Sequence, residues 1–193
     1  MFGTTYMSEQ INILGFAGSL RKDSLNRALL RAALEFVPPE AKLEIFELDG
    51  IPPFNQDLES SVPVKVQEFK SKIKAADALL IVTPEYNYSV PGVLKNAIDW
   101  ASRPPGDNSF DNKPAAIMSA STGILGGARA QYHLRQTLVF LNVHPVNKPE
   151  IFVTSAGQKF DSQGKLLDQK TGEFIAQLLG NLVTWTKTLQ GQS

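Results

Sequence analysis

The chain alternates short apolar runs with amphipathic segments of helical period, and this alternation limits its fold more than any other feature. The first apolar run covers residues 11–17, and the run ALLIVT at residues 78–83 is almost wholly apolar. A short run that is apolar on both faces is typical of an interior strand of a parallel sheet. The segments between the runs carry apolar residues at helical spacing, so the pattern predicts an α/β protein.

The alternation of strand and helix continues to the end of the chain without a linker, an internal repeat or a low-complexity tract. The expected strands are residues 11–17, 42–48, 78–83, 115–120 and a region within 143–155, and the expected helices are 24–37, 64–75, 91–101, 128–141 and 173–189. Right-handed crossovers favour a doubly wound, five-stranded parallel sheet of order 2-1-3-4-5, the flavodoxin-like arrangement. We predict that residues 11–193 form this single domain and that residues 1–10 form a flexible tail.

Composition excludes several classes of function. The 19 basic residues balance 19 acidic ones, so no strong field favours nucleic acid or anionic lipid. The chain has no cysteine, which excludes disulfides and thiolate metal sites, and redox chemistry would need a bound cofactor. The sequence shows no secretory signal and no apolar run near the ~20 residues of a membrane span. We therefore expect a cytoplasmic protein that acts on small molecules, with no nucleic-acid or membrane partner.

The loop GSLRKDSLN at residues 18–26 lies between the first predicted strand and the first predicted helix. Helix starts bind anions through free N–H groups and the positive end of the helix dipole. Arg21 adds a permanent, forked charge suited to phosphate, and Ser19, Ser24 and Asn26 can add neutral hydrogen bonds. The same residues also fit a simpler interpretation, in which Ser24 caps the helix and Arg21 is a solvated charge.

Known nucleotide loops and phosphoacceptor sites do not fit this segment. A Walker loop ends in Gly-Lys-Ser or Gly-Lys-Thr, and a dinucleotide fingerprint needs Gly-x-Gly-x-x-Gly; neither occurs between residues 15 and 28. The carboxylates that a phosphoacceptor receiver domain needs after its first and third strands are also missing, since Glu85 is the one acid there. A serine and arginine cradle suits a monophosphate that is held whole, without a metal.

Two further loops follow the third and fourth predicted strands. PEYNY at residues 84–88 offers aromatic rings, peptide planes and an amide side chain, which could border a flat ring. STGILGG at residues 121–127 contains three glycines, which let backbone approach a ligand closely. Taken alone, each loop also fits an ordinary surface turn. Because the carboxyl ends of parallel strands meet at one edge of a sheet, the three loops are expected to form a common site.

Together, the segments GSLRKDSLN, TPEYNYSVPGVLKNAIDWASRP and STGILGGARAQYHLRQ strongly resemble the NAD(P)H-dependent FMN reductase family, nearest to its quinone and chromate reductase branch. The resemblance covers most of residues 11–149 and is most specific over residues 84–100. It implies bound FMN, with NADPH or NADH as co-substrate. The cofactor-binding residues that it implies are Ser19, Arg21, Ser24, Leu25, Asn26, Pro84, Glu85, Tyr86, Asn87, Tyr88, Ser119 and Gly123.

The mechanism that the resemblance implies places the chemistry on the cofactor. NAD(P)H would stack on an open flavin face, pass a hydride to N5 and leave, and a quinone-like acceptor would then take the electrons at the same face. Chromate, azo compounds and free flavin are further candidate acceptors, and no side chain is named as an obligatory acid or base. Two alternatives remain, a flavodoxin-like electron carrier and a flavin-sensing module. Zero net charge disfavours the carrier, and NADPH oxidation with a quinone would exclude both.

The resemblance also implies a homodimer or homotetramer, because this family commonly shields its flavin by dimerising. The residues expected at the contacts are the apolar Val93, Leu94, Ile98 and Trp100, and the pair Arg129 and Tyr132 with Tyr88 and Glu150 as polar partners. The alternative is that Trp100 and Tyr132 complete the core of a single chain.

Overall fold

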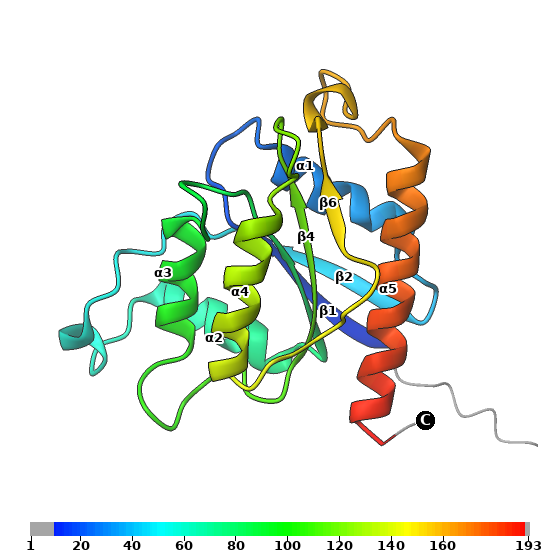
Figure 1. The fold of residues 1–193 in the computed structure, drawn as a ribbon. Helices are drawn as coiled ribbons and strands as arrows, with labels where there is room; N and C mark the ends of the chain where they lie inside the picture. The colour runs from blue at the N-terminus through cyan, green and yellow to red at the C-terminus, as the bar shows by residue number, and fades with distance from the viewer. Residues whose placement is uncertain (1–9, 192–193) are drawn as a thin grey trace, which may run out of the picture.

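Parallel strands form one twisted sheet, with helices on both of its faces (Figure 1). The computed structural model describes residues 10–191, so residues 1–9 of the predicted tail lie outside the described part. The first four strands are β1 (Ile11–Ala17), β2 (Ala41–Phe46), β3 (Ala78–Val82) and β4 (Pro114–Ala120). Their order is β2-β1-β3-β4, followed by β5, which confirms the predicted flavodoxin-like arrangement.

The fifth position of the sheet differs from the prediction, because two short strands share it. β5 (His144–Pro145) pairs with the beginning of β4, and β6 (Ile151–Val153) pairs with the end of β4. Pro145 and Pro149 have no amide hydrogen to give to a sheet ladder, so the strand is interrupted between them. Over residues 10–191, the sheet therefore contains six strands rather than the predicted five.

The helices begin close to the predicted positions. They are α1 (Leu25–Ala32), continued by the 3-10 turn η1 (Ala33–Phe36), α2 (Val64–Ala75), α3 (Gly92–Ala101), α4 (Ala128–Phe140) and α5 (Gln169–Leu189). The Ser24 side chain accepts a hydrogen bond from the amide of Arg27 and caps α1, as predicted. Asp168 caps α5 by accepting from the amide of Thr171, and α5 therefore begins four residues before the predicted start at residue 173.

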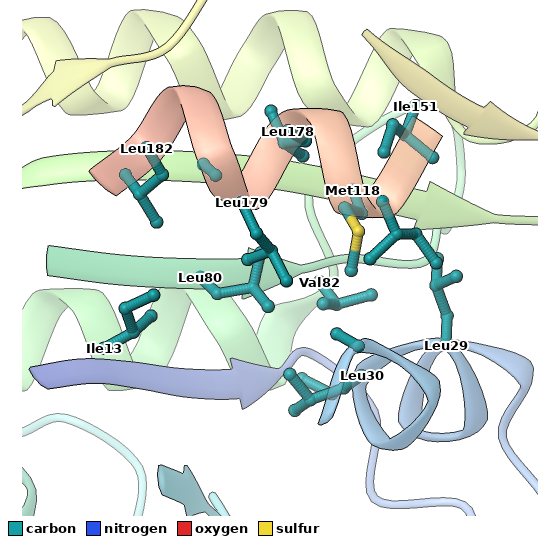
Figure 2. Packing of buried hydrophobic residues seen from close by; sticks show 14 of the residues in the cluster. Ile13, Leu29, Leu30, Leu80, Val82, Met118, Ile151, Leu178, Leu179 and Leu182 are labelled. Atoms are coloured by element: carbon teal, nitrogen blue, oxygen red, sulfur yellow. The ribbon is translucent and has the colours of Figure 1, made fainter. Parts of the chain in front are cut away.

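Alternating strand residues supply two hydrophobic cores, one on each face of the sheet. Ile13, Leu80 and Met118 point toward α1 and α5, where they meet residues such as Leu29 and Leu179 (Figure 2). The intervening strand residues pack against α2, α3 and α4. With both faces covered, the carboxyl edge of the sheet is the place where polar loops gather. Within residues 10–191, no helix has the length and apolar character needed to cross a membrane.

The outer side of α3 is covered by the chain itself. Trp100 is 1% exposed, and its Nε1 donates a 2.8 Å hydrogen bond to the carbonyl of Pro52. Its ring packs edge-on against Phe54, with 5.0 Å between ring centroids. Leu94 and Ile98 are equally buried in the core. The expectation that these three α3 residues meet a second subunit is therefore wrong, and Trp100 completes the core of the single chain.

Candidate functional site

A cavity of about 240 Å³ opens at the carboxyl edge of the sheet, where the loops after β1, β3 and β4 converge. The sequence predicted this convergence. The residues that line the cavity are Ser19, Arg21, Ser24, Leu25, Asn26, Pro84, Glu85, Tyr86, Ala120, Ser121 and Thr122. Eight of the twelve predicted cofactor-binding residues are thus brought to one place; the others are Asn87, Tyr88, Ser119 and Gly123.

One end of the cavity is formed by the loop before α1. Ser19 and Ser24 are both buried, and the exposed Arg21 stands beside them in the cavity lining. The Ser24 oxygen accepts from an α1 amide, which leaves its own hydrogen free to donate to a ligand. Capping and ligand binding are therefore compatible at Ser24. One guanidinium, two hydroxyls and a helix start with no acidic residue in its first turn form a donor set that fits the monophosphate of FMN.

Asn26 joins the start of α1 to the end of β4. Its Nδ2 donates to the carbonyl of Ala120 and its Oδ1 accepts from the amide of Ala120, each at 2.9 Å. The last backbone hydrogen bond between β4 and the chain that follows β3 runs from the Thr83 amide to the Met118 carbonyl. Two residues later, the side-chain amide of Asn26 bonds the backbone of Ala120 as a neighbouring strand would. Its polar side-chain atoms hold these two segments together, and the residue is also part of the cavity lining.

Ser119 lies beneath the third loop and outside the cavity lining. It is fully buried, donates to the carbonyl of Gly126 at 2.6 Å and accepts from Nε2 of Gln131 at 2.7 Å. A Cβ at Gly127 would lie 2.8 Å from the Ser119 Cβ, and Gly127 also has a positive φ of 87°. Glycine is therefore required there, and Ser119 supports the loop from below.

The wall of the cavity at the third loop comes from residues of the predicted loop region that are not among the twelve predicted cofactor-binding residues. Ala120, Ser121 and Thr122 line it, whereas Gly123 lies outside the lining and donates its amide to Oγ of Ser121 at 3.1 Å. The sequence offered one indication that these three residues would line the cavity, which is their position at the carboxyl end of a buried strand.

The loop after β3 contains a tight, strained turn. Tyr86 and Ser89 exchange both backbone hydrogen bonds, and the two residues between them, Asn87 and Tyr88, have positive φ angles of 49° and 69°. Asparagine tolerates this conformation, but a tyrosine there costs on the order of 1–3 kcal/mol. We name residues 84–89 the ring loop. Tyr86, with half of its surface exposed, lines the cavity, whereas Asn87 and Tyr88 shape the turn outside it.

The carboxylate of Glu85 caps α4 from a distant part of the chain. It accepts from the amides of Arg129 at 3.1 Å and Ala130 at 3.4 Å, and it forms an ion pair with the Arg129 guanidinium. The hydrogen bond that the Arg129 side chain donates to Glu85 raises the pKa of Arg129 above its ordinary value, so the guanidinium stays charged. The guanidinium also lies 3.5 Å above the ring of Tyr88. Glu85 is therefore part of the cavity lining, while its negative charge stabilises the start of α4.

The polar pairs expected between subunits are found within one chain. Arg129 contacts Tyr88, and the Tyr132 hydroxyl donates to the Glu150 carboxylate at 3.4 Å. The Glu150 charge raises the pKa of Tyr132, which keeps the hydroxyl protonated. Tyr132 is half exposed, so it does not complete the monomer core.

Comparison with known sequences connects this cavity to a group of flavoenzymes. Residues 11–158 match the model of the NADPH-dependent FMN reductase family. An NAD(P)H-dependent FMN reductase of Pseudomonas aeruginosa is 55% identical over 186 residues, which cover 96% of this chain and 100% of that protein. An NADPH:quinone oxidoreductase of Arabidopsis thaliana is 44% identical over 199 residues, which cover 100% of both chains.

Solved structures agree with the sequence comparison. FerB, the flavoenzyme NAD(P)H:(acceptor) oxidoreductase of Paracoccus denitrificans, matches with a TM-score of 0.85 and 35% identity. The match covers 92% of this chain and 98% of FerB.

Proposed function

The chain belongs to the NADPH-dependent FMN reductase family, and from this premise we propose that it reduces quinone-like acceptors by two electrons. Its cofactor is FMN, and NADPH or NADH is its co-substrate. The observation that carries the proposal is that a monophosphate donor set and a tightly turned loop suited to a flat ring meet in one cavity. The similarity to quinone oxidoreductases supports the choice of acceptor.

The residues of this chain would bind and orient the cofactor. Arg21, Ser19, Ser24 and the start of α1 would hold the phosphate, because they combine a fixed charge with donors that are already in place. Leu25 and Asn26 border the adjoining part of the cavity, where the ribityl chain would lie. Pro84, Glu85 and Tyr86 would border the ring, with Asn87 and Tyr88 shaping their turn and with Ser119 and Gly123 supporting the third loop.

Bound FMN supplies the redox chemistry, which is the transfer of a hydride from NAD(P)H and of two electrons to the acceptor. The protein contributes a fixed orientation and oriented backbone dipoles, and we assign no side chain as an obligatory acid or base. Donor and acceptor would use the same open side of the cavity in turn. Initial-rate kinetics with parallel double-reciprocal lines would support this ping-pong order, and intersecting lines would contradict it.

Chromate, azo compounds and free flavin are further acceptors that we propose for testing beside quinones. FMN held in this cavity would supply electrons to any acceptor that can enter the cavity, so a broad acceptor range is expected. We also propose a cytoplasmic location, where NAD(P)H is supplied, and cell fractionation tests it.

We further propose that the protein is a homodimer or homotetramer. Tyr132, Val139 and Phe140 on the outer face of α4 are exposed, and Phe140 leaves 90% of its surface open. Tyr132 and Val139 are seven residues apart and share one helix face. Apolar side chains gathered in this way favour a protein partner, and a second copy would cover them. A monomer in light scattering that keeps full FMN occupancy and quinone reductase activity would contradict this proposal.

The test of the function begins with mass analysis of the cofactor released from purified protein, followed by steady-state NADPH oxidation with a quinone. Release of FMN and quinone-dependent turnover are expected. Bound FMN without such turnover would favour an electron carrier or a sensing module.

The Arg21→Ala variant tests the phosphate site. We expect it to raise the Kd for FMN about 30-fold, or about 2 kcal/mol, the lower end of the range for removing one partner of a charge pair, because Arg21 is exposed. Lys22→Ala is the matched control, since Lys22 is an adjacent exposed cation outside the cavity lining. Equal Kd values for the two variants would show that Arg21 is an ordinary surface charge.

A further inference from the structure

We propose that Arg129 is a positioning residue for the cofactor ring, which acts through Glu85 and Tyr88 to hold the ring loop in its strained conformation. Arg129 does not line the cavity. The inference rests on the proposed function in one respect, namely that the FMN ring lies against this loop. It concerns a contact within one chain, between the start of α4 and the turn that follows β3.

The turn needs an external support, because its sequence does not favour its shape. In a two-residue turn with positive φ at both central positions, the second position strongly prefers glycine. Here that position is Tyr88, with a φ of 69°. A bulky residue held in this region persists where the surroundings fix it, and such residues gather at functional sites.

Arg129 contacts the ring loop at two points, at Glu85 before the strained turn and at Tyr88 within it. Its guanidinium pairs with the carboxylate of Glu85, whose side chain is 9% exposed, so that this nearly buried charge depends on its partner. The same guanidinium lies 3.5 Å above the Tyr88 ring, a favourable cation–π arrangement. Tyr86, which lines the cavity, lies between these two contacts in the sequence.

A second contact from α4 reaches the end of the turn. Nδ1 of His133 lies 2.9 Å from Oγ of Ser89, within hydrogen-bond distance. His133 is four residues after Arg129, so both side chains project from the same side of α4. The helix thus contacts the loop through Arg129 and His133, neither of which lines the cavity, and leaves the Tyr86 side chain free to meet a ligand.

Fixing the loop in advance lowers the cost of binding a flat ring. A loop that loses its fixed conformation must be ordered again when the cofactor binds. The entropy lost in this ordering lowers the affinity for the cofactor even when every direct contact between loop and cofactor is kept. Loss of Arg129 is therefore expected to weaken FMN binding even though the residue does not touch the cavity. Replacing Tyr88 by glycine removes the backbone strain, so the turn then keeps its shape with less support.

The test measures the Kd for FMN by fluorescence titration of the cofactor-free protein in four variants. Arg129→Gln should raise the Kd roughly tenfold, which corresponds to about 1.4 kcal/mol. The double variant Arg129→Gln/Tyr88→Gly should bind FMN more tightly than Arg129→Gln alone, which a general loss of packing would not produce. Lys72→Gln is the control, because it removes a partly exposed cation that pairs with Glu44, away from the cavity. Tyr88→Leu keeps the strain without the cation–π contact and should also raise the Kd, so the test holds if Arg129→Gln fails to fold.

Light scattering of each variant separates this role from a contact between subunits. A rise in Kd at unchanged molar mass, with recovery in the double variant, supports the proposal. A Kd for Arg129→Gln equal to that of Lys72→Gln overturns it, and so does a loss of affinity that follows a change of assembly and is not recovered in the double variant. If the unmodified protein does not bind FMN, the proposed function itself is refuted, and the positioning role that rests on it is refuted with it.

Discussion

Replacing Asn26 by alanine should destabilise the protein strongly, because two buried backbone groups lose their partners. Asn26 is 3% exposed and forms both of its 2.9 Å hydrogen bonds with the backbone of Ala120, which is itself buried. A buried polar group without a partner costs about 1–3 kcal/mol. Two such groups beside a cavity that admits water should lower the free energy of unfolding by about 2–4 kcal/mol.

Urea denaturation of the cofactor-free protein measures this loss, and two further variants isolate its cause. Asn181→Ala removes one hydrogen bond, to the carbonyl of Lys148, at an exposed position on α5 and should cost less than about 1 kcal/mol. Asn26→Asp keeps the acceptor for the Ala120 amide but places an oxygen against the Ala120 carbonyl, so it should rescue little. If Asn26→Ala and Asn181→Ala lose equal stability, or if Asn26→Asp restores it, the assigned role of this pair is wrong.

Three further predictions concern stability. Gly127→Ala should cost more than about 2 kcal/mol, because the new Cβ would lie 2.8 Å from that of Ser119 at a positive φ. Gly180→Ala, with open space around the new Cβ in the middle of α5, should instead stabilise the protein by about 0.5–1 kcal/mol, and thermal melting compares the two variants. Hydrogen bonds from Thr171 hold the pKa of Asp168 below its usual range, so its contribution is complete above about pH 4 and is lost as the pH falls through the lowered pKa. Asp168→Asn should therefore flatten the fall in unfolding free energy below about pH 4 in a urea titration series, and an unchanged slope would contradict this assignment.

The parts of the fold that depend on local pattern could be predicted from the sequence. Buried strands show as apolar runs because both faces of a parallel sheet are covered, and right-handed crossovers then restrict their order. The helix cap at Ser24 could be predicted from the sequence, because the capping hydrogen bond joins residues only three positions apart. The interruption of the fifth strand also had a local signal in Pro145 and Pro149, which the expected strand within residues 143–155 did not take into account.

The contacts that shape the site join distant segments and leave no local pattern. Asn26 and Ala120 are 94 positions apart, and Glu85 and Arg129 are 44 apart. A helical period shows which side of α3 faces the sheet, but it does not show that the segment with Pro52 returns across the opposite side, and this is why Trp100 was misplaced. The motifs located the cavity, whereas the division between lining and supporting residues came from three-dimensional packing.

The central claim is that this cavity holds FMN and that the bound cofactor passes two electrons from NAD(P)H to a quinone. Anaerobic titration of the purified protein, monitored by flavin absorbance, tests it most directly. We expect FMN at one per chain, bleaching by a stoichiometric amount of NADPH or NADH, and full recovery of the absorbance on addition of a stoichiometric amount of quinone. Release of FAD in place of FMN, or a flavin spectrum that neither nucleotide bleaches, would contradict the account.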